Sequence, residues 1–452
     1  MKFKLPKRLF FFIMFLFVIF FYYVSIHANF FIFLIMSFVF LYLILLIITV
    51  YFVYPDIAKV RPFPKVTPTV AVVTYAFNNF YPVKRTVEYL VKLKYPIPFT
   101  VYVITDGTCT FLKKIKGVKQ ILIDPKYFSK SKNTKAIIMN EGLKYIHEEN
   151  MLCVDGDTII EDDTLLKMTG FLCEENVVAV NGVLVPENRC NFWEKVQVIE
   201  YSLNWGIYLR ILSAMNSINI PIGAMSLMKK KIFDELGGYS IDSFVEDKEL
   251  GYRIIKAGYK IRCAETARGF TETPNNIKGW FNQRKRWARG ELATIYEHRD
   301  VLFNHKYRVF GLFILPFTFF VQTIGVAFVF SYIFIYLKKQ LIYVYFLSLE
   351  FIKNSIFVLP KFTSFILPST IYIFILSMII FIIYAISAFK ITKFTLSYKY
   401  ILPFIFFMLI YTYLLVSVYL ISMVLEFFNS KNKWHAIEYK EDWDKSSDKN
   451  GK

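Results

Sequence analysis

The sequence contains few of the residues on which several common enzyme classes depend. Cysteine and histidine each occur five times in 452 residues, and neither forms a C-x-x-C pair or an H-E-x-x-H motif. The chain also has no G-x-S-x-G segment and no G-x-x-x-x-G-K-[ST] loop. These absences count against zinc-binding modules, zinc proteases, hydrolases with a nucleophile elbow and P-loop enzymes.

The few cysteines also bear on the redox compartment. They are odd in number and widely spaced, and all of them fall in the middle of the chain: Cys109, Cys153, Cys173, Cys190 and Cys263. A disulfide framework would need closer and paired cysteines, so a reduced, cytosolic setting is the simplest interpretation.

Acidic residues are scarce relative to basic ones. Lys plus Arg is 54 and Asp plus Glu is 35, which gives a net charge of 54 − 35 = +19. Such a balance suits nucleic acid, anionic lipid or a phosphorylated substrate. No zinc-finger spacing or RNA-binding signature is present, so we expect no nucleic-acid partner. Lipid headgroups and the positive-inside rule account for much of the excess.

Apolar residues are abundant and unevenly distributed. They make up 56% of the chain, with 49 phenylalanines, and they gather in blocks at both ends. This pattern excludes a disordered protein and predicts membrane segments around a water-soluble domain. The predicted divisions are an N-terminal transmembrane hairpin (1–60), a cytosolic domain (61–305), C-terminal transmembrane helices (306–430) and a polar tail (431–452).

The apolar blocks divide into segments close to the ~20 residues that cross a bilayer as a helix. The first block has no signal-peptide cleavage pattern, so we expect a hairpin with both outer ends in the cytoplasm. The predicted spans are Leu9–Ile26, Phe30–Tyr54, Phe310–Leu337, Ile371–Phe389 and Ile401–Phe428.

One further segment, Gln340–Leu359, is ambiguous. It contains Glu350 and Lys353 near its middle. Each mid-membrane charge costs ~3 kcal/mol on the insertion scale, whereas each Leu, Ile, Phe or Val returns only ~0.3–0.6 kcal/mol. A crossing helix, a re-entrant segment and an interfacial helix therefore all stay open, and so does the side on which the tail lies.

The middle of the chain alternates strand-like and helix-like segments. Val-rich runs of strand length occur at Thr69–Thr74, Thr100–Thr105, Met151–Val154 and Val177–Val185, and helix-like stretches include Val83–Leu93 and Lys135–His147. This alternation predicts an α/β domain with a mostly parallel sheet and crossover helices. Ligands of such sheets bind at the carboxyl ends of the strands.

Acidic residues follow two of the predicted strands. Asp106 comes after Thr105, and Asp155 and Asp157 come directly after Val154 with a glycine between them. Two hard oxygen donors at this spacing suit a Mg²⁺ or Mn²⁺ ion that also holds a diphosphate. The alternative interpretation is a solvated acidic turn.

A second acidic pair, Glu246-Asp247, follows a turn-like Gly237-Gly238. Acidic residues at the start of a helix are favoured by the helix dipole, which is the simpler interpretation. The alternative is that one of the two carboxylates is a general base.

A basic helix is predicted around Gln283, Arg286 and Trp287, which share one helical face. Apolar residues keep a helical period around them at Ile277, Trp280, Phe281, Trp287, Ala288, Leu292 and Ile295, and the basic residues predicted opposite them are Lys278, Lys285 and Arg289. The pattern is typical of a helix that lies on a membrane surface. In addition, Trp287 could stack on a sugar and Arg286 could bind a diphosphate.

Together and in this order, these elements resemble the membrane-integrated family 2 glycosyltransferases. That family includes the poly-N-acetylglucosamine, hyaluronan, chitin and cellulose synthases and the ceramide glucosyltransferases. The resemblance runs from Val70 to Gly290 and implies a Rossmann-like GT-A fold. Asp155-Gly-Asp157 takes the place of the D-x-D motif, Val245-Glu-Asp247 that of T-E-D, and Gln283 to Trp287 matches Q-x-x-R-W.

The resemblance also implies a role for individual residues. Asp247 would be the catalytic base with Glu246 beside it, and Asp157 and Asp155 would hold the Mg²⁺ or Mn²⁺ ion. Gly223, Ala224, Gln283 and Trp287 would bind the acceptor. The donor nucleotide would contact Tyr75, Phe77, Asn79, Asp106, Lys135, Asp155 and Arg286. Tyr75 and Asn79 stand where the family usually has Pro and Glu.

The function implied is an inverting transfer of a sugar, N-acetylglucosamine or glucose, from a UDP-sugar to a growing polysaccharide. Processive synthesis with coupled translocation is expected, in a multi-pass protein of the plasma membrane with a cytoplasmic catalytic domain. The lipid bilayer is then a partner, and the resemblance allows accessory export subunits. Two alternatives stay open: a single transfer to a lipid acceptor, and a catalytically silent scaffold or channel subunit.

Overall fold

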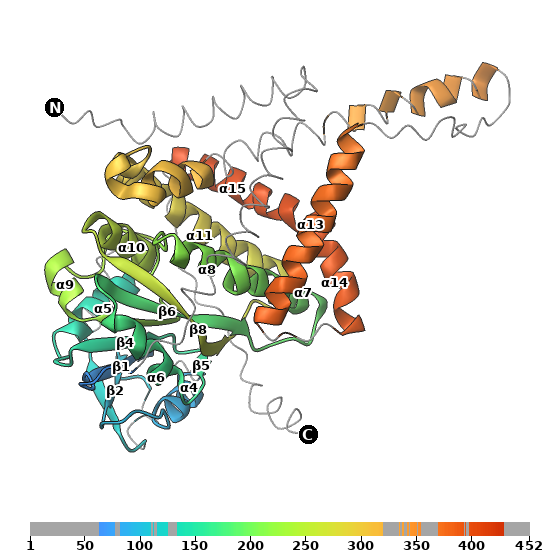
Figure 1. Cartoon of the computed structure of the whole chain (residues 1–452). Helices are drawn as coiled ribbons and strands as arrows, with labels where there is room; N and C mark the ends of the chain where they lie inside the picture. Colours follow the sequence, from blue (N-terminus) through green and yellow to red (C-terminus); the bar gives the residue numbers. More distant parts are fainter. Residues whose placement is uncertain are drawn as a thin grey trace.

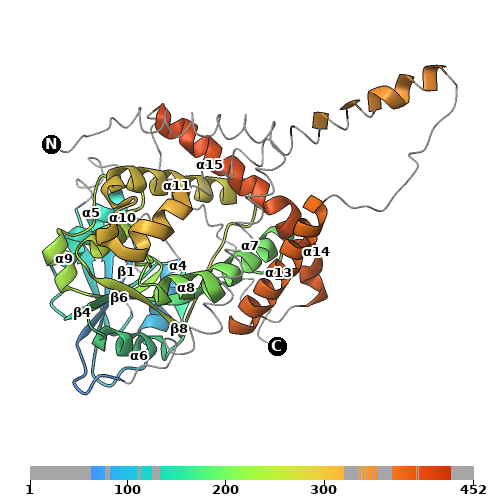
Figure 2. The ribbon, with the colours of Figure 1, turned by 45° about the horizontal axis from the view of Figure 1, so that its top comes forward.

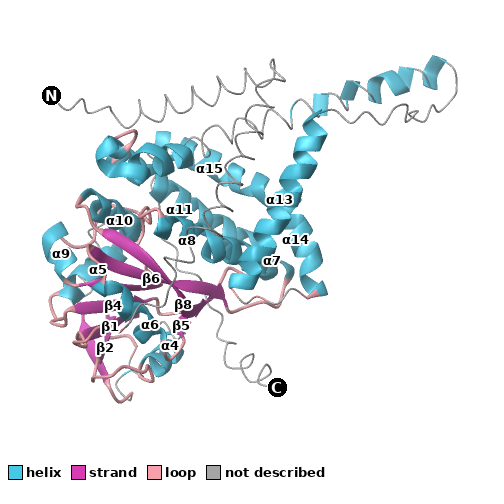
Figure 3. Cartoon of the chain, in the orientation of Figure 1, coloured by secondary structure: helices cyan, strands magenta, loops and turns pink. Residues whose placement is uncertain are grey.

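The structure is a computed structural model that describes residues 63–319 and 369–428, apart from 77–81, 110–111, 113–114, 125–132, 393 and 395–396, together with parts of 334–353. The predicted hairpin in 1–60 and the tail 431–452 lie outside the described residues. An α/β unit and a group of helices packed on it form the described part (Figure 1, Figure 3).

The centre of the α/β unit is an eight-stranded sheet with the order β3-β2-β1-β4-β7-β6-β8-β5. The strands are β1 (Val70–Ala76), β2 (Thr100–Thr105), β3 (Val118–Leu122), β4 (Asn150–Val154), β5 (Thr158–Ile160), β6 (Val177–Pro186), β7 (Met225–Lys229) and β8 (Lys260–Thr271). All four predicted strands are present, and the prediction for β2 has the observed bounds.

The sheet is mixed rather than simply parallel. β3, β2, β1 and β4 pair in parallel, and β6 pairs in parallel with β8. β7 is antiparallel to both β4 and β6, and β5 is antiparallel to β8. Six strands therefore run in one direction, and β7 and β5 run in the other. The reversed strands begin at the edge where the other six end.

Both faces of the sheet are covered, as the continuous burial of the strands requires. Alternate residues of β1 belong to different hydrophobic clusters: Val73 shares one with Ala136 of α5 and Leu292 of α11, and Val72 shares the other with Leu165 of α6. The helices of the unit are α4 (Pro82–Leu90), α5 (Thr134–Leu143), α6 (Thr164–Thr169), α7 (Phe192–Leu203), α8 (Leu209–Ala214), α9 (Lys231–Leu236), α10 (Glu246–Lys256) and α11 (Ile277–Glu297).

The described residues after α11 include a short apolar helix at Phe310–Phe319 and the helices α13 (Ser369–Ile391), α14 (Ile401–Phe406) and α15 (Thr412–Phe427). Among the described residues, the continuous helical stretch Tyr398–Phe427 is the one long and apolar enough to cross a membrane. The predicted span Ile371–Phe389 lies within α13, and Phe310–Leu337 is described only to residue 319. The multi-pass arrangement therefore stays a prediction.

The C-terminal helices pack directly on the α/β unit (Figure 2). α13 approaches the turn between α7 and α8 so closely that a Cβ atom at Gly206 would lie 2.9 Å from the carbonyl oxygen of Ala388. A side chain larger than hydrogen at this position would push the two segments apart.

The predicted basic helix is confirmed as α11, but one part of its predicted pattern was wrong. Trp280, Leu292 and Ile295 are buried against the rest of the protein, as apolar positions should be. Arg289, predicted on the polar face, is also buried, because its guanidinium pairs with Glu426 of α15. That α11 lies on a membrane surface stays a prediction.

An aromatic cluster joins α11 to the π-helical turn Phe407–Tyr411, which leads directly into α15. The indole N–H of Trp280 donates a hydrogen bond of 2.8 Å to the hydroxyl of Tyr411, and both side chains are almost fully buried. Trp193 of α7 packs edge-on against Trp280 with ring centroids 5.3 Å apart. A buried N–H donor without an acceptor is costly, so Tyr411 specifies how α11 and α15 dock.

We predict that Tyr411→Phe lowers the stability of the protein by about 1–3 kcal/mol, because the buried Trp280 N–H loses its acceptor. Thermal unfolding of the detergent-purified protein measures this loss. Tyr413→Phe is the matched control, since Tyr413 lies on the same helix with its side chain exposed. An equal effect of the two substitutions would contradict the assigned role of Tyr411.

Candidate active site

The predicted site residues gather at one edge of the sheet. The carboxyl ends of β1, β2 and β4 lie at this edge, and so do the amino ends of the reversed strands β5 and β7. Asp106, Asp155, Asp157 and Gly223-Ala224 consequently all adjoin it, although they are far apart in the sequence. The reversal of β7 is what brings Gly223-Ala224 to the acidic residues.

The Asp155-Gly156-Asp157 segment forms a tight turn between β4 and β5. Within the turn, the Thr158 amide donates to the Asp155 carbonyl at 3.0 Å. From outside, the hydroxyl of Thr86 on α4 donates to the Gly156 carbonyl at 2.9 Å. The turn is thus anchored on both sides, which holds the two carboxylates at the edge of the sheet.

Lys135, in the first turn of α5, connects this turn to the second acidic pair. Its ammonium lies 3.1 Å from Asp155 Oδ1 and 3.3 Å from Glu246 Oε1. The ammonium also lies 4.7 Å from the centre of the Tyr75 ring at the end of β1. This one cation therefore contacts three of the segments that the sequence analysis singled out.

The second acidic pair, Glu246 and Asp247, forms the first two residues of α10, which confirms its predicted location at the start of a helix. Glu246 accepts a hydrogen bond of 2.7 Å from the side-chain amide of Asn133, which also caps α5. Asp247 accepts two backbone hydrogen bonds, from Gly223 at 3.1 Å and from Lys248 at 2.8 Å. The two neighbouring carboxylates thus have different partners.

The loop before β7 holds both acidic segments together. The Gly223 amide donates to Asp247, and the Ala224 carbonyl accepts from the Asp155 amide at 3.3 Å. A Cβ atom at Gly223 would lie 3.1 Å from the Lys135 ammonium and 3.3 Å from Asp247 Oδ2. Only a residue without a side chain leaves this contact undisturbed, which explains glycine here.

The electrostatics of the cluster separate the two acids of α10. Burial raises the pKa of Asp247, and the adjacent Glu246 raises it further. Burial also acts to raise the pKa of Glu246, but Lys135 and the Asn133 hydrogen bond outweigh it and the pKa is lowered. Neighbouring acids with pKa values driven apart are typical of catalytic sites.

Asp155 is the most strongly perturbed carboxyl group of the cluster. Burial raises its pKa well above the ordinary value, and the negative charges of Asp157, Glu246 and Asp247 add to the effect. Arg286 of α11 opposes it, so α11 also faces this cluster. Among the described residues, the four carboxylates of this cluster are opposed by Lys135 and Arg286, so a further positive charge would be favourable here.

Gln283 and Trp287, the other residues of the Q-x-x-R-W segment, both contact Arg284, a residue that the sequence analysis missed. Arg284 is buried, pairs with Glu200 of α7 at 2.5 Å and donates to the Gln283 side chain at 2.6 Å. Its guanidinium also lies 4.2 Å from the centre of the Trp287 ring. Arg284 therefore holds in place the two predicted acceptor residues of this helix, Gln283 and Trp287. The signal available in the sequence was the spacing of Arg284, which places this basic residue on the buried face of α11.

The predicted nucleotide-binding residues are only partly tested by the geometry. Asp106 follows β2 and accepts hydrogen bonds from the backbone and hydroxyl of Thr108, at 3.0 and 2.6 Å. Asp106 adjoins the same edge of the sheet as the acidic cluster. Phe77 and Asn79 lie outside the described residues. The buried hydroxyl of Tyr75 has no hydrogen-bond partner among the described residues.

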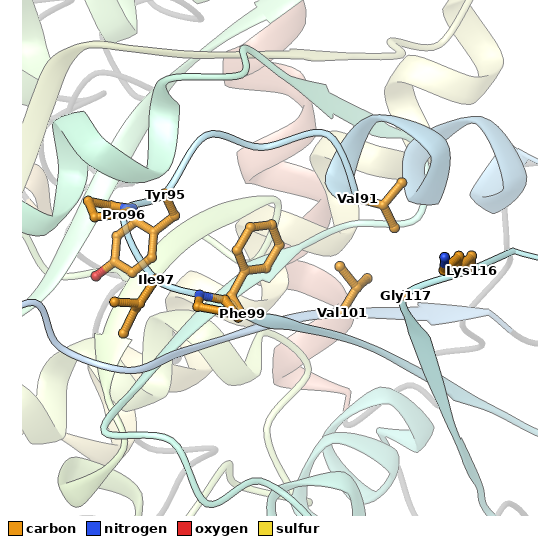
Figure 4. A pocket seen from close by; sticks show the side chains of 9 residues that line it. Val91, Tyr95, Pro96, Ile97, Phe99, Val101, Lys116 and Gly117 are labelled. Carbon is orange, nitrogen blue, oxygen red and sulfur yellow. The ribbon is translucent and has the colours of Figure 1, made fainter.

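A surface hollow of about 430 Å³ lies elsewhere, at the amino end of β2 (Figure 4). Its lining includes Tyr95, Phe99 and Lys116 and none of the predicted site residues. The hollow is on the edge of the sheet opposite to the acidic cluster, so it does not belong to this site.

The cluster is chemically suited to a divalent cation, although the described residues contain no group of three or more potential protein ligands at metal-binding distance. Asp155 and Asp157 offer hard oxygen donors, and the pKa of Asp155 is raised by burial and by neighbouring negative charges, which a cation would offset. A metal held by two carboxylates needs oxygen ligands from elsewhere, such as the phosphates of a bound nucleotide.

A match to a known family decides the class of the protein. The model of the "Glycosyl transferase family group 2" matches residues 151–425, which include the D-x-D, Glu246-Asp247 and Q-x-x-R-W segments and nearly all of α15. The chain belongs to this glycosyltransferase family. The predicted enzyme class is thereby confirmed. β1, β2 and Lys135 lie before the matched residues.

Similar proteins include two poly-β-1,6-N-acetyl-D-glucosamine synthases. The one from Staphylococcus epidermidis is 29% identical over 243 residues, which cover 53% of this chain and 58% of that protein. The one from Staphylococcus aureus (strain COL) is 27% identical over 263 residues, or 57% of this chain and 62% of that protein. The matches thus span about three-fifths of each relative.

A similar solved structure is the mannosyltransferase PcManGT from Pyrobaculum calidifontis in complex with GDP-Man and Mn²⁺. The similarity covers 78% of this chain and 97% of that one, with 15% sequence identity and a TM-score of 0.49.

We predict that Arg284→Met destabilises the protein by about 3–5 kcal/mol, because it leaves Glu200 buried without its cation. Thermal unfolding measures the loss. Lys285→Met is the matched control, since Lys285 is the adjacent basic residue and bonds to Asn282 in an exposed position. If Arg284→Met and Lys285→Met unfold at the same temperature, the buried pair does not organise this segment.

Proposed function

We propose that the chain is an inverting, UDP-sugar-dependent glycosyltransferase of the GT-A type that extends a polysaccharide, with N-acetylglucosamine as the sugar. The observation that carries this proposal is the cluster of Asp155, Lys135, Glu246 and Asp247 at one edge of the sheet. Membership of the glycosyltransferase family supports the reaction class, and the names of the two synthases support the sugar and polymer.

The donor diphosphate would bind between Lys135 and Arg286. Lys135 lies in the first turn of α5, where the helix dipole also favours an anion. Arg286 acts on the same cluster from α11. Two cations on opposite sides of the diphosphate would stabilise the negative charge that develops as the bond to the sugar breaks.

The acidic turn would complete this diphosphate site. A Mg²⁺ or Mn²⁺ ion held by Asp155 and Asp157 would supply Lewis-acid stabilisation of the departing diphosphate. The excess of carboxylates over cations in the cluster supports such a partner. Asp106 and Tyr75, at the ends of the two neighbouring strands, are the proposed contacts of the nucleoside.

Asp247 would be the general base. A base works best when its pKa approaches the working pH, and burial raises the pKa of Asp247 whereas that of Glu246 is lowered. In the proposed step Asp247 accepts the proton of the acceptor hydroxyl, whose oxygen bonds to the anomeric carbon as the diphosphate leaves. Attack opposite the leaving group inverts the anomeric centre.

The acceptor would lie between the Gly223-Ala224 loop and the Q-x-x-R-W segment. Gly223 contacts Asp247, so a hydroxyl placed along this loop would be within reach of the base. Trp287 presents a partly exposed ring that suits stacking on a sugar, with Arg284 on it. Processive extension through the adjoining helices is part of the proposal.

We predict that Asp247→Asn lowers turnover by at least about 100-fold, since general-base catalysis contributes 10²–10⁴-fold. UDP binding should stay within about two-fold, because the diphosphate is held by other residues. Sugar transfer and UDP affinity of the purified protein are the two measurements. Asp242→Asn, at an exposed acid just before α10, is the control. Full activity of Asp247→Asn would remove Asp247 from the base role.

A panel of UDP-sugars tested on membranes should give incorporation from UDP-N-acetylglucosamine into a ladder of polymer lengths. The mass of the products identifies both the sugar and the number of units. A single labelled lipid species would support the lipid-acceptor alternative, and absence of transfer from every donor would support a silent scaffold.

A further inference from the structure

Three consecutive residues of α11, Arg289, Gly290 and Glu291, lie between the start of α10 and helix α15. In both views α11 runs between these two helices (Figure 1, Figure 2). This 289–291 segment is not part of the site described above. Each of its residues contacts the segment on either side of Asp247, from Phe244 to Lys248, and two of them also bind α15.

Glu291 forms a two-sided contact through its carboxylate. One oxygen lies 2.5 Å from the ammonium of Lys248, the residue after Asp247. The other accepts a hydrogen bond of 3.2 Å from the hydroxyl of Tyr419 on α15. The Lys248 and Glu291 side chains are only 16% and 13% exposed, so solvent screens their attraction much less than that of a surface pair.

Gly290 allows α11 to lie directly on the residue that precedes α10. A Cβ atom at this position would overlap Cγ2 of Val245. The close approach removes the space in which the Val245–Lys248 turn could shift toward α11. The position of this turn is therefore defined by backbone packing as well as by charge.

Arg289 adds a second connection to α15. Its guanidinium pairs with Glu426 at 2.6 Å, with both side chains almost fully buried, and lies 5.5 Å from the centre of the Phe244 ring. A buried pair of this kind is costly to break, because the remaining charge stays without compensation. Arg289 thus ties the segment before Val245 to the end of α15.

From these contacts we propose that the 289–291 segment is a positioning device that couples α15 to Asp247. The connection runs from Tyr419 through Glu291 to Lys248, whose backbone amide donates to Asp247 Oδ1 at 2.8 Å. Displacement of α15 would move the residue that orients the carboxylate. This inference rests on the proposed base role of Asp247 and names Glu291 as a positioning residue that does not touch substrate.

Because of this geometry, we expect changes in the 289–291 segment to affect turnover rather than donor binding. The segment contacts the start of α10, whereas the proposed diphosphate contacts come from α5, from the turn after β4 and from Arg286. A small misplacement of a catalytic group can cost up to about 10²-fold in rate. Loss of one of the three contacts should therefore lower kcat by about ten-fold and leave the KM for the donor within about two-fold.

The test is Glu291→Gln, which keeps the shape of the side chain and an acceptor for Tyr419 but removes the charge that attracts Lys248. We expect kcat to fall by about ten-fold with donor KM, UDP affinity and unfolding temperature nearly unchanged. Tyr419→Phe, which removes the hydrogen bond from α15 to Glu291, should lower kcat several-fold. The double variant should behave like Glu291→Gln alone, since both changes interrupt one connection.

Lys256→Gln is the matched control, because Lys256 also ties α10 to a later segment through an ion pair with Asp300, but at the far end of the helix. It should leave kcat unchanged. An unchanged kcat in Glu291→Gln, a parallel loss of kcat and unfolding temperature, or additive effects in the double variant would overturn the coupling. A failure of the proposed base role can be distinguished from a failure of the coupling, because it appears as full activity of Asp247→Asn.

Discussion

The arrangement depends on the ammonium of Lys135, which lies between Asp155 and Glu246. The carboxylates that follow β4 and begin α10 would repel one another, and their desolvation would be costly without a cation in contact with both. Asn133 places Lys135 there by capping α5 while it bonds to Glu246. One helix start therefore both compensates the acids and provides the cation expected to face a diphosphate.

The mixed sheet explains why distant residues meet at this ammonium. If β7 ran parallel to β4, the Gly223-Ala224 loop would lie at the opposite edge and could bond neither to Asp247 nor to Asp155. Its reversal instead inserts that loop between the two acids. The α11 helix then closes the cluster with Arg286 and connects it, through Arg289 and Glu291, to the helix that has the length and composition of a membrane span.

Local patterns in the sequence were enough to predict much of this. The Val-rich run Thr100–Thr105 coincides with β2, and the acids Asp155 and Asp157 follow a strand as expected, because apolar runs and polar strand ends are local signals. The partners of Arg284 and Arg289 were not predictable in the same way. Glu200 and Glu426 lie far away in the sequence, so the spacing within α11 indicates that Arg284 is on the buried face but not which acid either arginine pairs with. The reversal of β7 likewise depends on tertiary pairing rather than on local composition.

The central claim is that Lys135 of α5 and Arg286 of α11 bind one diphosphate, together with an ion on the acids that follow β4 and beside the acid Asp247 of α10. An experimental structure of the full chain with UDP and Mn²⁺ tests it most directly. The account predicts the diphosphate against Lys135 and Arg286, the ion on Asp155 and Asp157, and Asp247 free to face an acceptor. Nucleotide bound away from this cluster, with Lys135 still closed on Asp155 and Glu246, would contradict it.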